Sequence, residues 1–255
     1  MLFNSYEFIL LFLPVTFLVF FAIARLGREA AIVWLVIASL FFYGWWNPSY
    51  LILILLSMVI NFGFGKFISH AYEHQRATWA RTGLTLGVVC NLGVLAYFKY
   101  AGFFSHNINT LTGASVDFGY IVLPLAISFF TFQQIAYLVD AYKGITQEYR
   151  FFHYALFVTF FPQLIAGPIV HHKEMLPQFM CRNTLKPQLD NVSVGLSIFF
   201  IGLFKKAVLA DGVAPYGTSV FDAAAAGETL SFFVAWGGAL AYTCLLYTSP
   251  SPRDL

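Results

Sequence analysis

Apolar residues along this chain gather into long runs that short polar stretches separate. A run of about 20 apolar residues is long enough to cross a bilayer as one helix. Five such runs open the chain, at residues 6–24, 30–46, 49–65, 82–98 and 120–139. The pattern therefore predicts five membrane-spanning helices in the first 140 residues. Gly83 and Gly87 have the spacing that lets two helices approach closely.

The next apolar run, residues 151–170, is broken by Pro162, Gly167 and Pro168. Irregular backbone at membrane depth is tolerated where protein or water satisfies its polar groups. We therefore predict a broken element here, which is either re-entrant or spanning. Two more apolar runs, 192–204 and 230–247, complete a predicted all-α fold, a polytopic transmembrane helical bundle. The topology of residues 151–247 stays open at this point.

The few basic residues orient the predicted helices. They follow the first, third and fifth runs, as Arg25 and Arg28, then Lys66, Arg76 and Arg81, then Lys143 and Arg150. The loop after the second run has none, and the loop after the fourth has Lys99 alone. Because Lys and Arg favour the cytoplasmic side, we expect the N-terminus to lie outside.

Composition agrees with a membrane protein and excludes a soluble domain. Of 255 residues, 59% are hydrophobic and 10% are charged, against roughly 25% charged residues in soluble domains. The net charge of +2 gives no indication of nucleic-acid binding. The three cysteines have no metal-ligand spacing, and we predict no metal site. His70, His74 and His106 are expected in solvated loops.

The stretch 128–140 carries the densest polar group inside an apolar run. Gln133, Tyr137 and Asp140 share one helical face at i, i+4 and i+7, and Gln134 is adjacent. Polar residues at membrane depth are costly and are candidates for function, so these side chains can form a polar tunnel wall. The alternative is hydrogen bonding between helices, which contributes about 0.6 kcal/mol per pair.

The second candidate stretch follows the broken run. Gln163, Gly167 and Pro168 belong to shaped, non-helical backbone, and the adjacent His171 and His172 precede Lys173, all near the membrane boundary. Either histidine can act as a general base, or can bind an anionic donor together with Lys173. The alternative is that the histidines bond to backbone or lipid headgroups.

The last residues change abruptly to a Ser- and Pro-rich composition. Helices seldom enter prolines in this way at membrane depth. We expect residues 1–243 to be the N-terminal part of a single membrane domain and residues 244–255 to be a non-native tail. The alternative is a short polar C-terminal tail.

In order along the chain, several of these stretches resemble the membrane-bound O-acyltransferase family. The resemblance is strongest to the bacterial branch that serves alginate and exopolysaccharide O-acetylation, with the teichoic-acid D-alanyl transfer protein as a relative. The segments that carry the resemblance are residues 1–8, 39–46, 99–100, 128–140, 160–170 and 202–211.

The resemblance implies a multi-pass enzyme of the bacterial inner membrane with a tunnel through the bilayer. An acyl group would come from a cytoplasmic cosubstrate, acetyl-CoA or another acyl donor, with no bound cofactor. It would pass to an exported polysaccharide, with help from an extracytoplasmic acyltransferase partner.

The resemblance also places the catalytic histidine in a C-terminal motif that this chain does not contain. The catalytic residue is therefore unknown, and we expect the fragment alone to be inactive. Relatives often have arginine where His171 stands.

Two other functions fit the same residues. One is acyl or D-alanyl transfer to teichoic acid, lipid or protein. The other is a transporter or membrane scaffold without acyl chemistry, because intramembrane polar residues and broken segments suit transporters too.

Overall fold

The computed structural model describes residues 3–45, 47–112, 122–145, 150–164, 167 and 172–248. Within these ranges the regular structure is helical and no residue is in a strand, which confirms the all-α prediction. The chain divides into two compact units, Val15–Lys186 with Met1, and Leu2–Pro14 with Pro187–Leu255. The two units are described separately.

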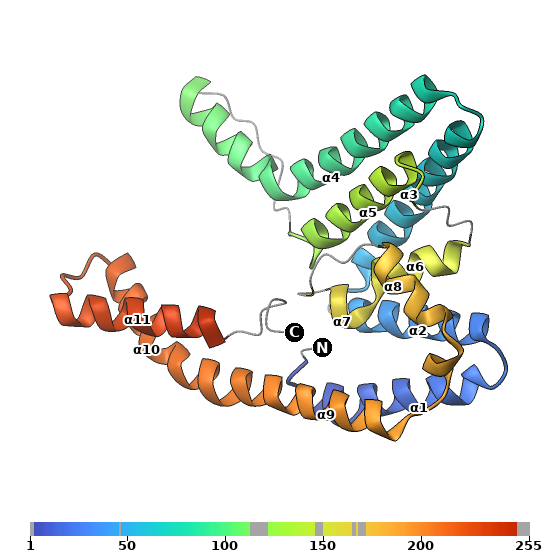
Figure 1. The fold of residues 1–255 in the computed structure, drawn as a ribbon. Coiled ribbons are helices and arrows are strands. Elements are labelled where there is room, and N and C mark those ends of the chain that lie inside the picture. Colours follow the sequence, from blue (N-terminus) through green and yellow to red (C-terminus); the bar gives the residue numbers. More distant parts are fainter. Residues whose placement is uncertain are drawn as a thin grey trace. The chain divides into compact units, whose positions relative to one another are not determined.

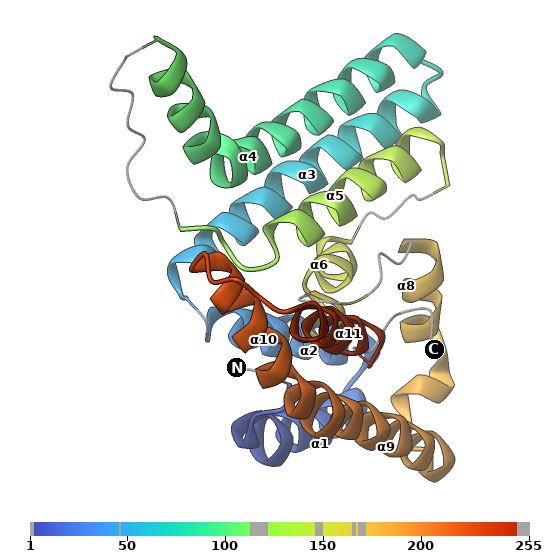
Figure 2. The ribbon, with the colours of Figure 1, turned by 90° about the vertical axis from the view of Figure 1, so that its left-hand side faces the viewer.

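The first unit contains most of α1 and all of α2 to α8. The bounds are α1 (Leu13–Ala24), α2 (Arg28–Gly44), α3 (Ser49–Glu73), α4 (Ala77–Thr112), α5 (Ile127–Tyr142), α6 (Phe151–Thr159), α7 (Phe161–Leu164) and α8 (His172–Met180), followed by the 3₁₀ turn η2 (Arg182–Leu185). Helices α3, α4 and α5 pack side by side (Figures 1 and 2), and α2 packs on α6.

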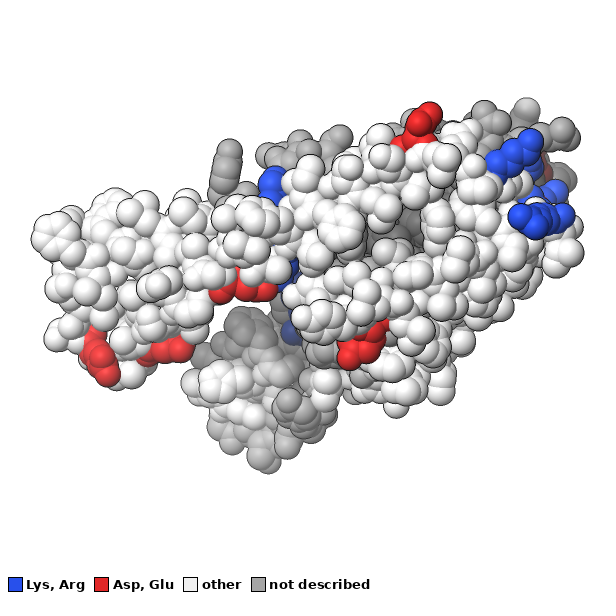
Figure 3. Space-filling model, turned by 90° about the horizontal axis from the view of Figure 1, so that it is seen from below, with Lys and Arg blue, Asp and Glu red and all other residues white. Residues whose placement is uncertain are grey.

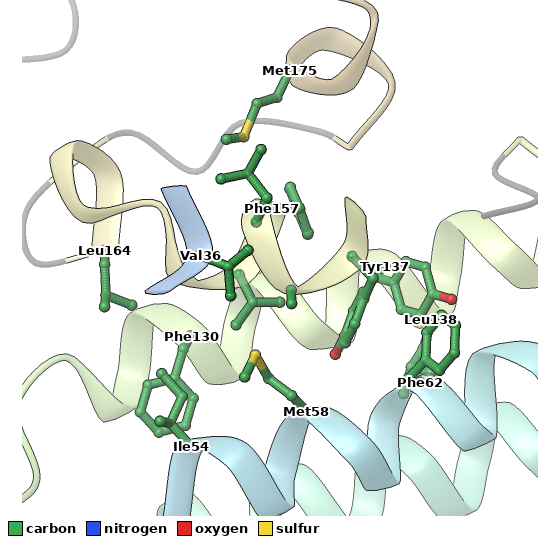
Figure 4. Packing of buried hydrophobic residues seen from close by; sticks show 14 of the residues in the cluster. Val36, Ile54, Met58, Phe62, Phe130, Tyr137, Leu138, Phe157, Leu164 and Met175 are labelled. Carbon is green, nitrogen blue, oxygen red and sulfur yellow. The ribbon is translucent and has the colours of Figure 1, made fainter. Parts of the chain in front are cut away.

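The core of the first unit lies where α3, α5 and α6 meet. Met58 of α3, Leu138 of α5 and Phe157 of α6 are each at most 1% exposed. Figure 4 shows these side chains interleaved with other apolar residues of the same cluster. Burial of a side chain of this size contributes about 1.5–3 kcal/mol in a water-soluble protein. Lipid gives little such driving force between helices, so close packing takes its place.

Glycines on α4 allow that close packing. A Cβ at Gly83 would lie 2.8 Å from Cδ1 of Phe67 on α3, and a Cβ at Gly87 would lie 2.6 Å from Cδ1 of Leu138 on α5. The sequence spacing that predicted close helix approach is confirmed at both positions.

The second unit is built from helices that the sequence places at both ends of the chain. Its elements are the π-helix η1 (Glu7–Phe12), α9 (Leu189–Phe204), the π-helix η3 (Lys205–Ala210), α10 (Asp211–Ala225) and α11 (Phe232–Thr248). Helices α10 and α11 pack on each other (Figure 1). Lys206 and Asp211 form an ion pair across the π-helix, five residues apart. The pair offsets charges that an apolar helix carries at high cost.

Four helical segments are long and apolar enough to cross a membrane, within the described ranges. They are Glu7–Ala24, Ser49–Glu73, Ala77–Leu111 and Leu189–Ala225. The other two early runs also form helices, α2 and α5, with 17 and 16 residues. The predicted broken element is confirmed, because α6 ends at Thr159 and only the four-residue α7 follows before the described chain is interrupted.

Three details of the predicted element boundaries are wrong. Residues 99–112, which lie beyond the end of the predicted fourth run, continue α4, because no proline interrupts them and one glycine is tolerated. Residues 205–225 continue the helix that starts at α9. His70 and His106, predicted in loops, lie within α3 and α4.

Large apolar side chains are exposed over both units, as expected for surfaces that face lipid. Examples are Leu86 and Val89 on α4 and Phe200 and Ile201 on α9, each more than half exposed. Charged side chains are sparse on the face in Figure 3.

Candidate functional site

The polar face of α5 is buried inside the first unit. Gln133, Gln134, Tyr137 and Asp140 are all at most 5% exposed. The Tyr137 ring stacks obliquely on Tyr154 of α6, with 4.5 Å between the ring centroids. The structure therefore brings the predicted polar residues of α5 into the protein interior.

A hydrogen-bonded cluster joins this face to two neighbouring helices. Ser57 Oγ and Asn61 Nδ2, both on α3, donate to Gln134 Oε1 over 2.6 and 2.7 Å. Asn61 also exchanges hydrogen bonds with Asn91 of α4, over 3.1 and 2.5 Å. Asn91 Nδ2 donates in addition to the Gly87 carbonyl at 2.7 Å. We call Ser57, Asn61, Asn91 and Gln134 the amide cluster.

The amide cluster makes the interhelical hydrogen bonds that the sequence offered as the alternative to a tunnel wall. Such bonds hold helices together and satisfy polar groups that lipid cannot. Gln134 thus has a packing role whatever else it does, and its place along a substrate path stays a prediction.

Three buried polar atoms near this region have no hydrogen-bond partner among the described residues. They are Gln133 Oε1, Gln134 Nε2 and the Tyr154 hydroxyl. A buried polar group without a partner costs about 1–3 kcal/mol. Orphaned polar groups of this kind are candidates for binding a ligand or an internal water.

A backbone hydrogen bond links the broken segment to α2. The Phe161 amide donates to Ser39 Oγ at 3.2 Å, and both groups are buried. The Gly167 amide donates to the Gln163 carbonyl at 2.9 Å. A Cβ at Gly167 would lie 2.5 Å from the Gln163 Cα, which is backbone and cannot yield cheaply. Gly167 is therefore required for the turn that follows α7.

Glu29, an acidic residue outside the predicted site, joins α2 to α6. Arg150 Nη1 donates to Glu29 Oε1, and His153 Nε2 lies 3.2 Å from Glu29 Oε2. The His153 side chain is 2% exposed, whereas the Glu29 side chain is about half exposed. Glu29 thus fixes the start of α6, the helix that leads into the broken segment.

The remaining predicted site residues can be placed only in part. Pro168 and His171 lie outside the described residues. His172 and Lys173 belong to the first turn of α8, but the structure does not describe their side chains. Whether the two candidate stretches meet in one site therefore stays a prediction.

Sequence reasoning missed Ser57, Asn61, Asn91 and Glu29. A usable signal was present for the two asparagines, because each interrupts an apolar run at membrane depth. Among the described residues, no three His, Cys, Asp or Glu side chains are placed to hold one metal ion.

Residues 141–249 match the sequence model of the MBOAT, membrane-bound O-acyltransferase family. The chain is 42% identical over 274 residues to a peptidoglycan O-acetyltransferase of Helicobacter pylori, an alignment that covers 97% of this chain and 51% of the relative. It is 38% identical to a probable alginate O-acetylase AlgI of Pseudomonas aeruginosa, covering 97% and 46%. A third relative, the probable AlgI of Azotobacter vinelandii, is 37% identical. The chain spans about half the length of the curated relatives it matches.

Proposed function

The chain belongs to the membrane-bound O-acyltransferase family, and from this premise we propose that it takes part in moving an acetyl group onto an exported polysaccharide. The observation that carries the proposal is the 42% identity to a peptidoglycan O-acetyltransferase along 97% of the chain. Identity of 38% to an alginate O-acetylase over the same share supports the same class of acceptor. The donor is a cytoplasmic acyl thioester, acetyl-CoA.

Several buried polar groups of the first unit fit a path for the acyl group. Water must be kept from an activated acyl group, and a packed helical interior excludes it. The proposed path residues are Gln133, Gln134, Asp140, Gln163, Gly167 and Pro168, with His171, His172 and Lys173 on the donor side. The burial of Gln133, Asp140 and Gln163 supports this proposal.

The chain acts as the N-terminal part of a longer enzyme in the bacterial inner membrane. The length of its relatives supports this, because each is about twice as long. The histidine that activates the acceptor hydroxyl lies in the C-terminal part of that longer enzyme. An extracytoplasmic acyltransferase completes the transfer to the polymer.

Expression of the full-length parent gene should restore polysaccharide acetylation to bacteria that lack their own O-acetylase. One host makes peptidoglycan without acetate, and a second makes unacetylated alginate. Acetate released from the purified polymer by mild base is measured for each host. We expect ester-linked acetate on at least one polymer. Acetate on neither would overturn the proposed acceptor class, and D-alanine released from teichoic acid instead would support the other transfer.

Asp140→Asn in that parent tests the proposed path. Asp140 is buried on the polar face of α5, so we expect acetate on the polymer to fall about tenfold, which corresponds to about 1.4 kcal/mol in the barrier. The matched control is Asp190→Asn in the first turn of α9, where the side chain is exposed. Equal acetate from both variants would contradict a role for Asp140.

The proposed orientation predicts that the two ends of α4 lie on opposite sides of the membrane. After replacement of Cys90, Cys181 and Cys244 by serine, single cysteines are introduced at Gln75 and Thr110, both exposed. A membrane-impermeant maleimide should label Thr110→Cys in intact cells, and Gln75→Cys only after permeabilisation. The reverse pattern would place the N-terminus inside.

A further inference from the structure

The carboxamide of Gln134 is fixed in one orientation. Its side chain is 0% exposed, and Oε1 accepts hydrogen bonds from Ser57 Oγ at 2.6 Å and Asn61 Nδ2 at 2.7 Å. Oxygen and nitrogen lie on opposite edges of a planar carboxamide. Two donors on the oxygen therefore direct Nε2 away from Ser57 and Asn61.

Asn61, one of the two donors, is itself held by hydrogen bonds to α4. Asn61 and Asn91 bond reciprocally between α3 and α4, and Asn91 Nδ2 also donates to the Gly87 carbonyl. Asn61 therefore cannot rotate away from Gln134 without breaking bonds to α4. Hydrogen-bonded chains of this kind strengthen one another in a medium of low dielectric constant.

The nitrogen of this carboxamide makes no hydrogen bond within the described protein. Gln134 Nε2 is buried and has no hydrogen-bond partner among the described residues. A buried N–H without a partner costs free energy comparable to a lost hydrogen bond. An amide that three side chains on two other helices orient, and whose N–H edge has no partner among the described residues, is suited to a ligand that offers an oxygen.

We propose that Ser57, Asn61 and Asn91 are positioning residues that hold the Nε2–H of Gln134 for the carbonyl oxygen of the acyl group in transfer. The inference rests on the proposed function. The acceptor hydroxyl loses its proton to a base as its oxygen adds to the acyl carbon, and the carbonyl oxygen becomes negative. The C–S bond to CoA then breaks, the carbonyl re-forms, and the CoA thiolate leaves and takes up that proton. A neutral N–H that already faces it stabilises that charge without moving a proton.

The competing occupant of this edge is an internal water. A water would satisfy Nε2 and stabilise the fold, but it would leave the transfer rate per folded enzyme unchanged when the amide cluster is altered. Kinetics and folding must therefore be measured on the same variants.

The experiment compares Ser57→Val with Ser57→Thr in the full-length parent. Valine and threonine have the same shape, and threonine alone keeps the hydroxyl that donates to Gln134. Membrane vesicles receive [14C]acetyl-CoA, and transfer into the polymer that accepted acetate above gives kcat and KM. We expect Ser57→Val to lower kcat about tenfold, with little change in the KM for acetyl-CoA, and Ser57→Thr to retain it. Thermal unfolding in detergent is recorded for each variant.

A double-variant cycle tests whether Ser57 acts through Gln134. Gln134→Met, which has similar length and no amide, should lower kcat about 100-fold. Adding Ser57→Val to Gln134→Met should then change kcat no further. If Ser57→Val does not fold, Ser57→Ala removes the hydroxyl without added volume.

Three outcomes would overturn the inference. Equal kcat for Ser57→Val and Ser57→Thr would show that the hydroxyl does not matter. Additive effects in the cycle would show that Ser57 does not act through Gln134. Unchanged kcat in Gln134→Met, with a lowered unfolding temperature, would show that Gln134 Nε2 binds an internal water and not the acyl group. In all three the wild type stays active, whereas an inactive wild type would overturn the proposed function itself.

Discussion

Replacing Asn61 with leucine is expected to lower the free energy of unfolding by about 3 kcal/mol. Asn61 is 3% exposed, and its amide bonds to Gln134 and Asn91 on two other helices. Leucine removes these bonds and leaves buried acceptors with fewer donors. An interhelical bond in a membrane protein contributes about 0.6 kcal/mol on average, and the unpaired partners add the rest.

The measurement is reversible unfolding of the full-length parent by sodium dodecyl sulfate in mixed micelles. The matched control is Asn107→Leu on α4, whose Nδ2 donates to the Phe103 carbonyl of the same helix. We expect that variant to change the free energy of unfolding by no more than about 0.5 kcal/mol. If the free energy of unfolding falls equally little in both variants, the amide cluster does not hold α3, α4 and α5 together.

Gly65→Ala is the second change with a large expected effect. A Cβ at Gly65 would lie 2.4 Å from Cε1 and 2.6 Å from the hydroxyl oxygen of Tyr137. The Tyr137 ring is 2% exposed and packs on Tyr154, so it has little room to move aside. Overpacking of this kind costs about 1–3 kcal/mol. We expect the free energy of unfolding to fall by about 2 kcal/mol, measured by the same unfolding titration.

Gly63→Ala, on the same helix, should shift stability in the opposite direction. Nothing lies within 4 Å of a Cβ at Gly63. Alanine is favoured over glycine in a helix by about 1 kcal/mol or somewhat less, so this variant should be slightly more stable than wild type. If Gly63→Ala lowers the free energy of unfolding as much as Gly65→Ala does, the contact with Tyr137 does not cause the destabilisation.

The helices could be predicted from hydropathy, because the length of an apolar run is a property of the local sequence. The structure confirms that these runs are helical. Pro162 and Gly167 likewise predicted the break after α6, since proline lacks an amide hydrogen wherever it lies. The boundary at residue 98 was wrong for a related reason. Polarity marks where a helix leaves the lipid, but a helix does not have to end there.

The candidate site was predicted less completely. Gln133, Gln134 and Asp140 were selected because they are polar within an apolar run, and all three are buried. Asn61 and Asn91 are also polar within apolar runs, so the same rule predicts both of them. Glu29 gave no such signal, because an acidic residue beside Arg28 at a helix start is an ordinary surface feature. Its contact with His153 spans 124 residues of sequence.

Local patterns in the sequence are enough to identify a helical membrane protein with a broken element, and the family that it resembles. Hydropathy, proline and motif order depend on residues near each other in the chain. Which faces of α3, α4 and α5 meet is set by tertiary packing. Tertiary packing also brings Gln134 to Ser57 and Asn61, and places the Tyr137 ring against Gly65. Those contacts depend on the rotation and docking of whole helices, and no local pattern encodes either.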